Sequence, residues 1–153
     1  MNRLVIGAAA IACLSATAGV AALAPTHFDY ASASEESQQR FLERFGWGFR
    51  KIIGDGAGET AEVERVDADA RWNSVDVDIR FTEPQVETFS SSEVEAVAQA
   101  IYVEYCKTDD EKRLLEQGVR MNLRMKRPSG GALSNVVLDD ETCATFQSEE
   151  SAR

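Results

Sequence analysis

Two stretches of this chain alternate strictly between apolar and polar side chains, and this pattern constrains the fold more than any other feature. Residues 75–81 read VDVDIRF, and residues 119–126 read VRMNLRMK. Successive side chains of a β-strand point to opposite faces, so a period of two indicates a strand with one buried face and one solvated face. Each stretch therefore predicts a half-buried strand whose charged residues all lie on its solvent side.

Each of these strands has a second candidate strand next to it in the sequence. Residues 59–70 are a less regular strand with a bulge expected near Arg65, and a turn at residues 70–74 joins it to the strand at 75–81. Residues 128–131 read PSGG, which is typical of a turn, and residues 133–138 form the fourth strand. Strands joined by short turns pair as hairpins. We therefore expect an antiparallel sheet of about four strands, built from two hairpins.

A first helix is expected over residues 35–53, with Ser34 as its N-terminal cap. Its apolar side chains recur at three- and four-residue steps, at Phe41, Phe45, Phe49 and Ile52. Gly46 and Gly48 lie inside this helix, which indicates a kink or close packing of the helix on another element, and we favour the packing. The sequence GDGAG at residues 54–58 should end the helix as a loop.

A second helix spans about residues 90–107, where Ser92 and Glu95 have the spacing of a capping box. A short helix follows and stops at Gly118, a residue that suits a left-handed C-terminal cap. The expected fold class is α+β, with the antiparallel sheet packed against two amphipathic helices. The expected element order is α-β-β-α-(short α)-β-β.

The N-terminal segment has the features of an export signal. Arg3 precedes an uncharged, Ala-rich run from Leu4 to Ala24 that ends in small-x-small cleavage sites. We expect residues 1–24 to be a signal peptide, followed by a flexible lead at 25–33, a single domain at 34–146 and a disordered tail at 147–153. The run is long enough to span a bilayer, so an uncleaved anchor remains open. A lipoprotein site at Cys13 is a weaker alternative. All three place the domain outside the cytoplasm, in the periplasm or secreted.

Cysteine usage points to the same location. If the segment with Cys13 is removed, Cys106 and Cys143 remain. An even number of cysteines in an exported domain predicts one disulfide, with two free thiols as the alternative.

The charge balance excludes several classes of partner. The chain has 26 acidic and 16 basic residues and a formal net charge of −10. A charge of this sign opposes non-specific binding to nucleic acid and to anionic lipid. We expect no nucleic-acid partner, and membrane contact only through the N-terminal segment if it is uncleaved.

No arrangement of residues in the sequence indicates catalysis, a metal site or a cofactor. The single histidine, His27, lies in the expected flexible lead, and a nucleophile–histidine pair needs a rigid geometry. The spacing of acidic residues at 67–78 approaches that of a calcium loop. However, Arg71 and Trp72 stand where that loop needs an oxygen ligand and a glycine.

A basic stripe, defined here as Arg120, Arg124, Lys126 and Arg127, stands out in this acidic protein. It could dock an anionic partner. Alternatively, its members could pair with Asp76 and Asp78 across neighbouring strands, and we favour this second interpretation.

The leading function hypothesis is a non-enzymatic binding or accessory protein of a bacterial cell envelope. It would dock a protein partner through a face or an edge of its sheet. The alternative is a small-molecule-binding or hydrolytic domain with a cavity between helices and sheet. The aromatic residues that could line such a cavity are Trp47, Trp72, Tyr102 and Tyr105.

Overall fold

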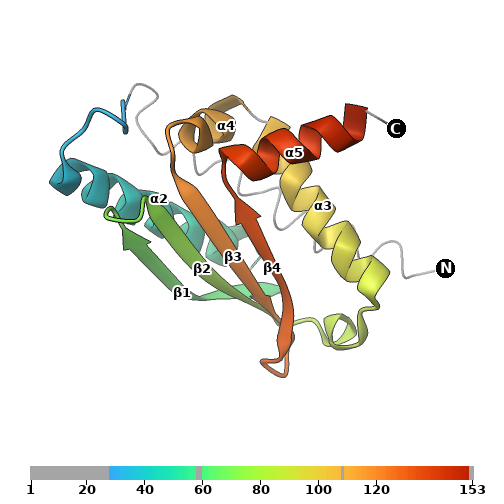
Figure 1. Cartoon of the computed structure of the whole chain (residues 1–153). Helices are drawn as coiled ribbons and strands as arrows, with labels where there is room; N and C mark the ends of the chain where they lie inside the picture. Colours follow the sequence, from blue (N-terminus) through green and yellow to red (C-terminus); the bar gives the residue numbers. More distant parts are fainter. Residues whose placement is uncertain (1–27, 58–59, 108, 152–153) are drawn as a thin grey trace.

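The computed structural model of the chain describes residues 28–57, 60–107 and 109–151 (Figure 1). The expected signal segment and His27 lie outside these residues, as do the side chains of Phe49 and Ile52. The elements, in chain order, are α2 (Glu35–Ala57), β1 (Ala61–Asp69), β2 (Ser74–Phe81), the 3-10 helix η3 (Pro84–Thr88), α3 (Ser91–Lys107), α4 (Asp109–Glu116), β3 (Arg120–Lys126), β4 (Ala132–Leu138) and α5 (Asp140–Ser151).

The fold is α+β, with a four-stranded mixed sheet of strand order β1-β2-β3-β4. β1 and β2 form one antiparallel hairpin, and β3 and β4 form the other. The expectation of an entirely antiparallel sheet is wrong at the centre, where β2 and β3 pair in parallel from Ser74↔Arg120 to Arg80↔Lys126. The connection through η3, α3 and α4 returns the chain to the end of the sheet where β2 began. Such a helical crossover makes the next strand run parallel to the previous one.

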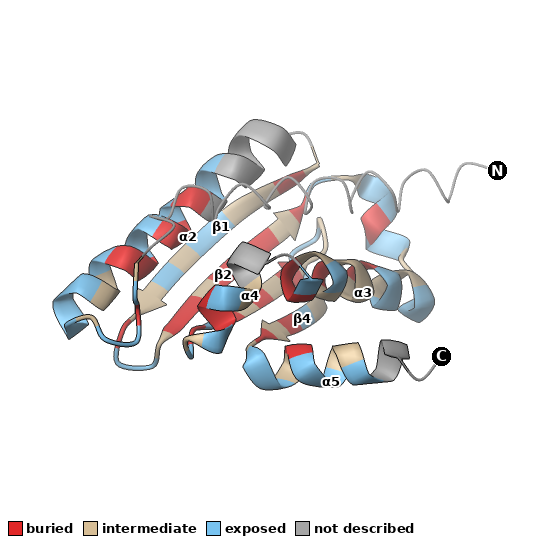
Figure 2. Cartoon of the chain, turned by 90° about the horizontal axis from the view of Figure 1, so that it is seen from above, coloured by how far each residue is buried: buried red, intermediate tan, exposed pale blue. Residues whose placement is uncertain are grey.

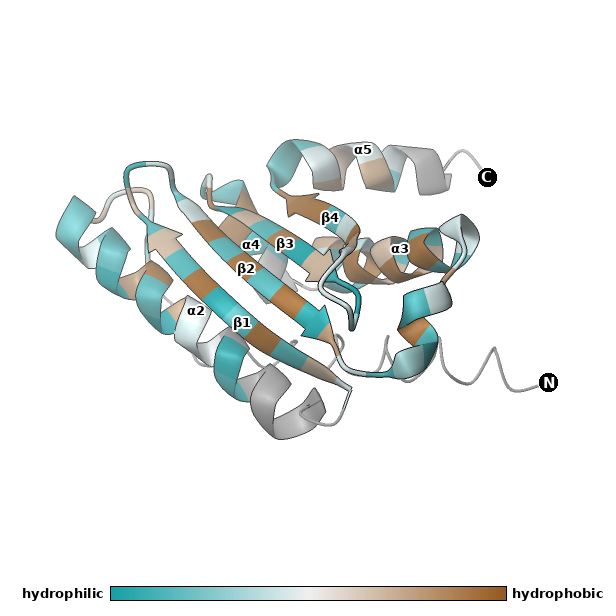
Figure 3. Ribbon diagram, turned by 90° about the horizontal axis from the view of Figure 1, so that it is seen from below, coloured by the Kyte–Doolittle hydropathy of each residue, from teal (hydrophilic) through white to brown (hydrophobic). Residues whose placement is uncertain are grey.

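The alternation in the sequence separates the two faces of the sheet as expected. On one face Val75, Val77 and Ile79 are fully buried, together with Met121 and Leu123 of the neighbouring strand. The helices lie over this face in Figure 2, and the change of hydropathy from residue to residue along β2 is visible in Figure 3. The opposite face of the sheet carries the charged residues.

The packing of α2 on β1 depends on Gly46. A Cβ atom at this position would lie 2.4 Å from Cγ1 of Val66, so the helix and the strand are closer than an alanine would allow. This confirms the close approach expected from the glycines. β1 also contains a register shift between Val63 and Arg65, which confirms the bulge expected there. The bulge keeps Val66 and Ala68 on the core side after the extra residue.

α2 extends to Ala57, although GDGAG was expected to end it as a loop. Helix elongation adds one hydrogen bond for each residue fixed, which can offset the weak helix propensity of glycine and aspartate.

The cap of α3 also differs from the expectation. Ser90 and Glu93 form its capping box, with the Ser90 N–H donating to Glu93 Oε2 at 2.8 Å, in place of Ser92 and Glu95. Gly118 has the positive φ (89°) expected after α4.

Residues 28–33, the described part of the flexible lead expected at 25–33, are anchored to the fold through Tyr30. Tyr30 is 1% exposed, and its hydroxyl donates to Asn73 Oδ1 at 2.9 Å. Its backbone N–H donates to Gln117 Oε1 at 2.6 Å. An aromatic ring that fills the core and satisfies its hydroxyl group holds this segment in place.

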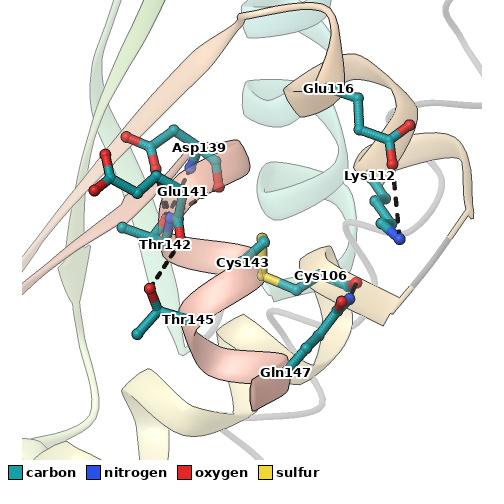
Figure 4. The surroundings of a disulfide bond; sticks show 9 residues. All are labelled: Cys106, Lys112, Glu116, Asp139, Glu141, Thr142, Cys143, Thr145 and Gln147. Carbon is teal, nitrogen blue, oxygen red and sulfur yellow. Dashed lines mark hydrogen bonds and ion pairs between the residues drawn. A yellow bond between two sulfur atoms is a disulfide. The ribbon is translucent and has the colours of Figure 1, made fainter. Parts of the chain in front are cut away.

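The C-terminal residues also differ from the expected tail, because Asp140–Ser151 form α5. The predicted disulfide between Cys106 and Cys143 is present, with a Cα–Cα distance of 5.2 Å, and it joins α3 to α5 (Figure 4). Gln147 Nε2 donates to the carbonyl of Cys106 at 2.8 Å. Residues 147–151 are thus the last residues of α5. The N-terminus of this helix is capped by Asp139 and Thr142, each of whose backbone N–H groups donates to the side chain of the other. In the described part of the chain, no helix combines the length and the hydrophobicity needed to cross a membrane.

Candidate functional site

The basic stripe is paired within the molecule. Arg124 Nε donates to Asp78 Oδ1 at 2.5 Å, and Lys126 Nζ donates to Glu64 Oε2 at 2.8 Å. Lys126 also lies 3.7 Å from Asp78 Oδ2. These contacts are possible because β2 and β3 are neighbours in register, with Asp78 opposite Arg124. The structure therefore favours cross-strand pairing over docking for these two cations.

The two ends of the stripe have structural partners too. Arg120 Nε is 3.2 Å from Asp139 Oδ2, so it pairs with the cap of α5 instead of with Asp76. Arg127 Nη1 donates to the carbonyl oxygens of Val86 and Glu87, at 3.0 and 2.8 Å. Arg127 therefore ties the β3–β4 hairpin to η3. All four members of the stripe have intramolecular partners.

Hydrogen bonding across this face shifts the ionisation of its side chains. The hydrogen bond from Lys126 lowers the pKa of Glu64, and the same bond raises the pKa of Lys126. Arg80 pairs with both Glu62 and Glu64, which extends the network to β1. The open face of the sheet thus carries a network of ion pairs that connects β1, β2 and β3. Asp78 is buried within this network, whereas solvent-exposed ion pairs contribute about 0.2–1 kcal/mol each.

The four candidate aromatic residues lie in different surroundings. Tyr105 is 1% exposed and belongs to the core, and Tyr102 stacks on Phe146 with ring centroids 5.6 Å apart. Trp47 and Trp72 are 61% and 76% exposed. Trp47 is two residues past the buried Phe45 on α2, a spacing that places it away from the buried side of a helix. The structure therefore separates two tyrosines of α3 from two tryptophans on the α2–β1–β2 side.

An open groove of about 840 Å³ lies between the N-terminal half of α2 and the β1–β2 hairpin. We call it the α2–β1 groove. Its lining includes Gln39 and Trp72, together with six carboxylates and two guanidinium groups: Glu35, Glu36, Glu43, Asp67, Asp69, Asp76, Arg40 and Arg71. The helix supplies one wall and the end of the hairpin supplies the other.

Gln39 closes the free edge of β1 within this groove. Its Nε2 donates to the carbonyl of Ala68, and its Oε1 accepts from the N–H of Ala70, both at 2.9 Å. β1 is an edge strand, and unpaired backbone groups at an edge invite another strand to pair with them. Here the Gln39 amide takes the place of that strand for Ala68 and Ala70.

The charges of the groove are only partly balanced. Arg40 pairs with Glu36, and Arg71 pairs with Asp69. The hydrogen bond from Arg71 lowers the pKa of Asp69. Asp67 pairs with Arg65 of β1. The remaining three carboxylates have no cation within ion-pair distance among the described residues: Glu35, Glu43 and Asp76. The groove is therefore negatively charged.

Trp72 stands at the rim of this groove on a fixed turn. The next residue, Asn73, has φ 49° and accepts the hydrogen bond from the buried Tyr30 hydroxyl. The carbonyl of Asn73 also accepts from the N–H of Arg120 at 2.8 Å, which joins the turn to the start of β3. The core thus anchors Asn73 while leaving the neighbouring indole ring in solvent. Turns favour small or polar residues, so the turn itself does not require a tryptophan here.

Trp72 was among the candidate residues expected from the sequence, whereas the groove was not expected. The order of elements could have predicted the groove, because a helix that a short connection joins to a hairpin packs alongside the first strand of that hairpin. The carboxylates near the start of α2 (Glu35, Glu36) then lie across from those near the end of β1 (Asp67, Asp69).

In the described ranges, no group of three or more histidine, cysteine or acidic side chains is arranged to hold a metal ion.

Comparisons with known proteins give a likeness of fold. No protein-family model matches the sequence, and no curated protein matches it. A crystal structure of a Pseudomonas aeruginosa protein described as secreted overlaps at TM-score 0.55 and 13% identity, covering 73% of this chain and 99% of that one.

Two pilotins of type II secretion systems overlap less well. AspS of Vibrio cholerae gives TM-score 0.47 at 15% identity, over 72% of this chain and 100% of that chain. EpsS of Vibrio vulnificus gives 0.48 at 14% identity, over 71% and 96%. These two overlaps are too loose to support an argument, and the P. aeruginosa structure supports the fold alone.

Proposed function

We propose that this chain is a non-enzymatic accessory protein of a bacterial cell envelope that docks a protein partner at the edge of its sheet, in the α2–β1 groove. The observation that carries the proposal is the position of Trp72, 76% exposed on an anchored turn at the rim of a concave surface. Tryptophan is enriched among the residues that contribute most to protein–protein binding, particularly where it enters a pocket.

The arrangement of the other surfaces supports the choice of this edge. The apolar face of the sheet is covered by α2 and α3, and the basic stripe of the charged face is paired within the molecule. The groove instead combines an exposed aromatic ring, a concave shape and three carboxylates that have no cation at ion-pair distance among the residues described. A small-molecule cavity would have been favoured by a deep pocket that holds two of the four aromatic residues, whereas this open groove is lined by Trp72 alone among them.

Two features support a location outside the cytoplasm. The N-terminal segment has the composition of a signal peptide. The disulfide between Cys106 and Cys143 belongs to the buried core, and such bonds persist in oxidising compartments.

Site-specific photocrosslinking in the producing cells tests the docking site. A photoreactive phenylalanine analogue replaces Trp72 in one variant. In a second variant it replaces Val103, an apolar residue on α3 that is 41% exposed. We expect a discrete crosslinked product from position 72 and none of the same mass from position 103.

The partner identified by the crosslink should no longer associate with a full-length chain that carries Trp72→Ala. Circular dichroism should show that this variant keeps its fold. Crosslinks of equal yield and mass from positions 72 and 103 would show that the groove is no preferred docking site. An absence of any product from position 72 in exporting cells would likewise contradict the proposal.

A further inference from the structure

From the charges and geometry of the α2–β1 groove we infer the chemistry of the partner: the groove receives a lysine- or arginine-bearing segment of a protein, with a cationic side chain against the Trp72 ring. This inference rests on the proposed function, because it assumes that the groove is the docking site. It adds which chemical class of segment the groove selects.

The first step is the charge of the lining. Six carboxylates and two guanidinium groups line the groove, and both arginines are already paired with carboxylates of the lining. Glu35, Glu43 and Asp76 remain without a cation at ion-pair distance in the part of the chain that the structure describes. Complementary charge steers association and excludes partners of the wrong sign. A cationic segment is therefore favoured, and an anionic lipid or nucleic acid is repelled.

The second step is the ring at the rim. An indole face attracts a lysine ammonium or an arginine guanidinium within about 6 Å of its centroid, and tryptophan does so best among the aromatic residues. Trp72 lies beside Arg71 in the sequence, but the Arg71 guanidinium is bound to Asp69 through both Nε and Nη2. The exposed indole ring is thus available to a cation from a partner.

The third step concerns how the segment binds. An exposed strand edge can add a strand through backbone hydrogen bonds, whatever the charge of the added segment. In this groove Gln39 already occupies the carbonyl of Ala68 and the N–H of Ala70. Recognition at this point of the edge must therefore use side chains, which makes charge the selecting feature.

The test uses the exported protein, purified with its disulfide intact, and two synthetic peptides as probes. One peptide alternates arginine and serine, and the other alternates glutamate and serine at the same length. Trp47→Phe leaves Trp72 as the single tryptophan of the chain, so its fluorescence reports on the groove. We expect the arginine peptide to give a saturable change, which weakens as salt is raised from about 0.05 M to about 0.5 M. The glutamate peptide should give no saturable change.

A matched pair of charge variants separates the groove from the general acidity of the protein. The groove variant carries Glu35→Gln, Glu43→Gln and Asp76→Asn. The control variant carries Glu83→Gln, Glu95→Gln and Glu141→Gln, which removes the same number of charges away from the groove. We expect the groove variant to bind the arginine peptide about tenfold more weakly, and the control variant to bind within about twofold of the parent.

Three outcomes would overturn the inference: equal weakening in both variants, equal binding of both peptides, or no saturable change with the arginine peptide. The crosslinking experiment distinguishes these results from failure of the proposed function. If the position-72 crosslink forms but the arginine peptide neither binds nor competes with it, docking stands and the cationic chemistry is wrong. If the peptide binds but no partner crosslinks at position 72, the groove has the inferred charge selectivity and the docking function fails.

Discussion

Gly46 shows how one residue sets the distance between two elements. Its missing side chain lets α2 approach Val66 of β1, and this contact positions the helix wall of the α2–β1 groove. The same strand carries Glu64, whose carboxylate joins β1 to Lys126 on β3 across the width of β2. The groove and the charged face thus both depend on single contacts made by β1.

Gly46→Ala should lower the free energy of unfolding by about 1–2 kcal/mol. An added Cβ overpacks the contact at a cost of about 1–3 kcal/mol, and the higher helix propensity of alanine returns up to about 1 kcal/mol. Thermal or denaturant unfolding measures the change. In a Val66→Ala background the clash is gone, so the same substitution should be neutral or stabilising. A Gly46→Ala protein that is more stable than its parent would show that the helix is not held at the distance described.

The Glu64–Lys126 pair predicts a pH-dependent stability. The pKa of Glu64 is lower in the folded protein, so its contribution is present above the unfolded pKa and is lost as pH falls through the folded pKa. Denaturant unfolding should show Glu64→Gln to be less stable by about 0.2–1 kcal/mol at neutral pH, and the difference should shrink as the pH falls below the unfolded pKa of the carboxyl group. In a Lys126→Met background the substitution should cost less, because Glu64 then keeps only its ion pair with Arg80. A difference that persists unchanged in acid would contradict this assignment.

At the scale of the elements, the last helix is held by one covalent bond and a few polar contacts. Cys143 connects α5 to Cys106 of α3, Gln147 bonds the Cys106 carbonyl, and Phe146 stacks on Tyr102. The cysteines are 37 residues apart in the sequence. Closing a loop of this length stabilises a fold by about 4 kcal/mol in the chain-entropy estimate.

Cys143→Ser should therefore reduce the free energy of unfolding by up to about 4 kcal/mol and loosen α5 before the sheet. Hydrogen exchange should show faster exchange of α5 amides, while the amides of β2 and β3 stay protected. Reduction of the unaltered protein should give the same pattern. Equal melting temperatures for the variant and the parent would show that α5 does not depend on the bond.

The strands and their faces followed from the sequence, because a period of two fixes which side of a strand is buried. The parallel pairing of β2 and β3 did not follow, since alternation carries no information about strand direction. That direction depends on α3 and α4 returning the chain to the other end of the sheet. The anchoring of Tyr30 and the extent of α5 were missed for a related reason. Each rests on contacts with distant residues, such as Asn73 and Cys106, and not on a local period.

The candidate site was predictable only in part. Trp72 and the pairing of Arg124 and Lys126 with Asp78 could be inferred from a turn and from two alternating strands. The α2–β1 groove depends on the position of α2 relative to β1. Gly46 and Gln39 contact Val66 and Ala68, which are remote from them in the sequence, and these contacts hold the helix in that position. Single-residue patterns do not encode such a displacement.

At the scale of the whole molecule, charge is distributed unevenly over an acidic protein. Most charged residues of the open face pair with one another, whereas the α2–β1 groove, which takes in Asp76 at the end of that face, retains carboxylates with no cation at ion-pair distance in the described part of the chain. A net charge of −10 keeps such a protein soluble and repels anionic surfaces. A cationic partner segment would thus meet an attractive long-range field as well as the local groove.

Export and disulfide formation should be coupled, which provides the last prediction. The chain has three cysteines, and deletion of residues 4–24 removes Cys13 together with the apolar run. The deleted protein should remain in the cytoplasm, where thiols are kept reduced, so an alkylating reagent should modify both Cys106 and Cys143. The full-length gene product should instead begin between about Ala22 and Thr26 after cleavage. Its two cysteines should resist alkylation until a reductant is added. Mass spectrometry of both proteins measures the mass of the N-terminal peptide and the number of alkylated thiols.

A full-length product that retains Met1 and sediments with washed membranes would establish an anchor in place of a cleaved signal. Reduced thiols in a processed, exported protein would separate the disulfide from export and remove one of the two supports for the extracytoplasmic location.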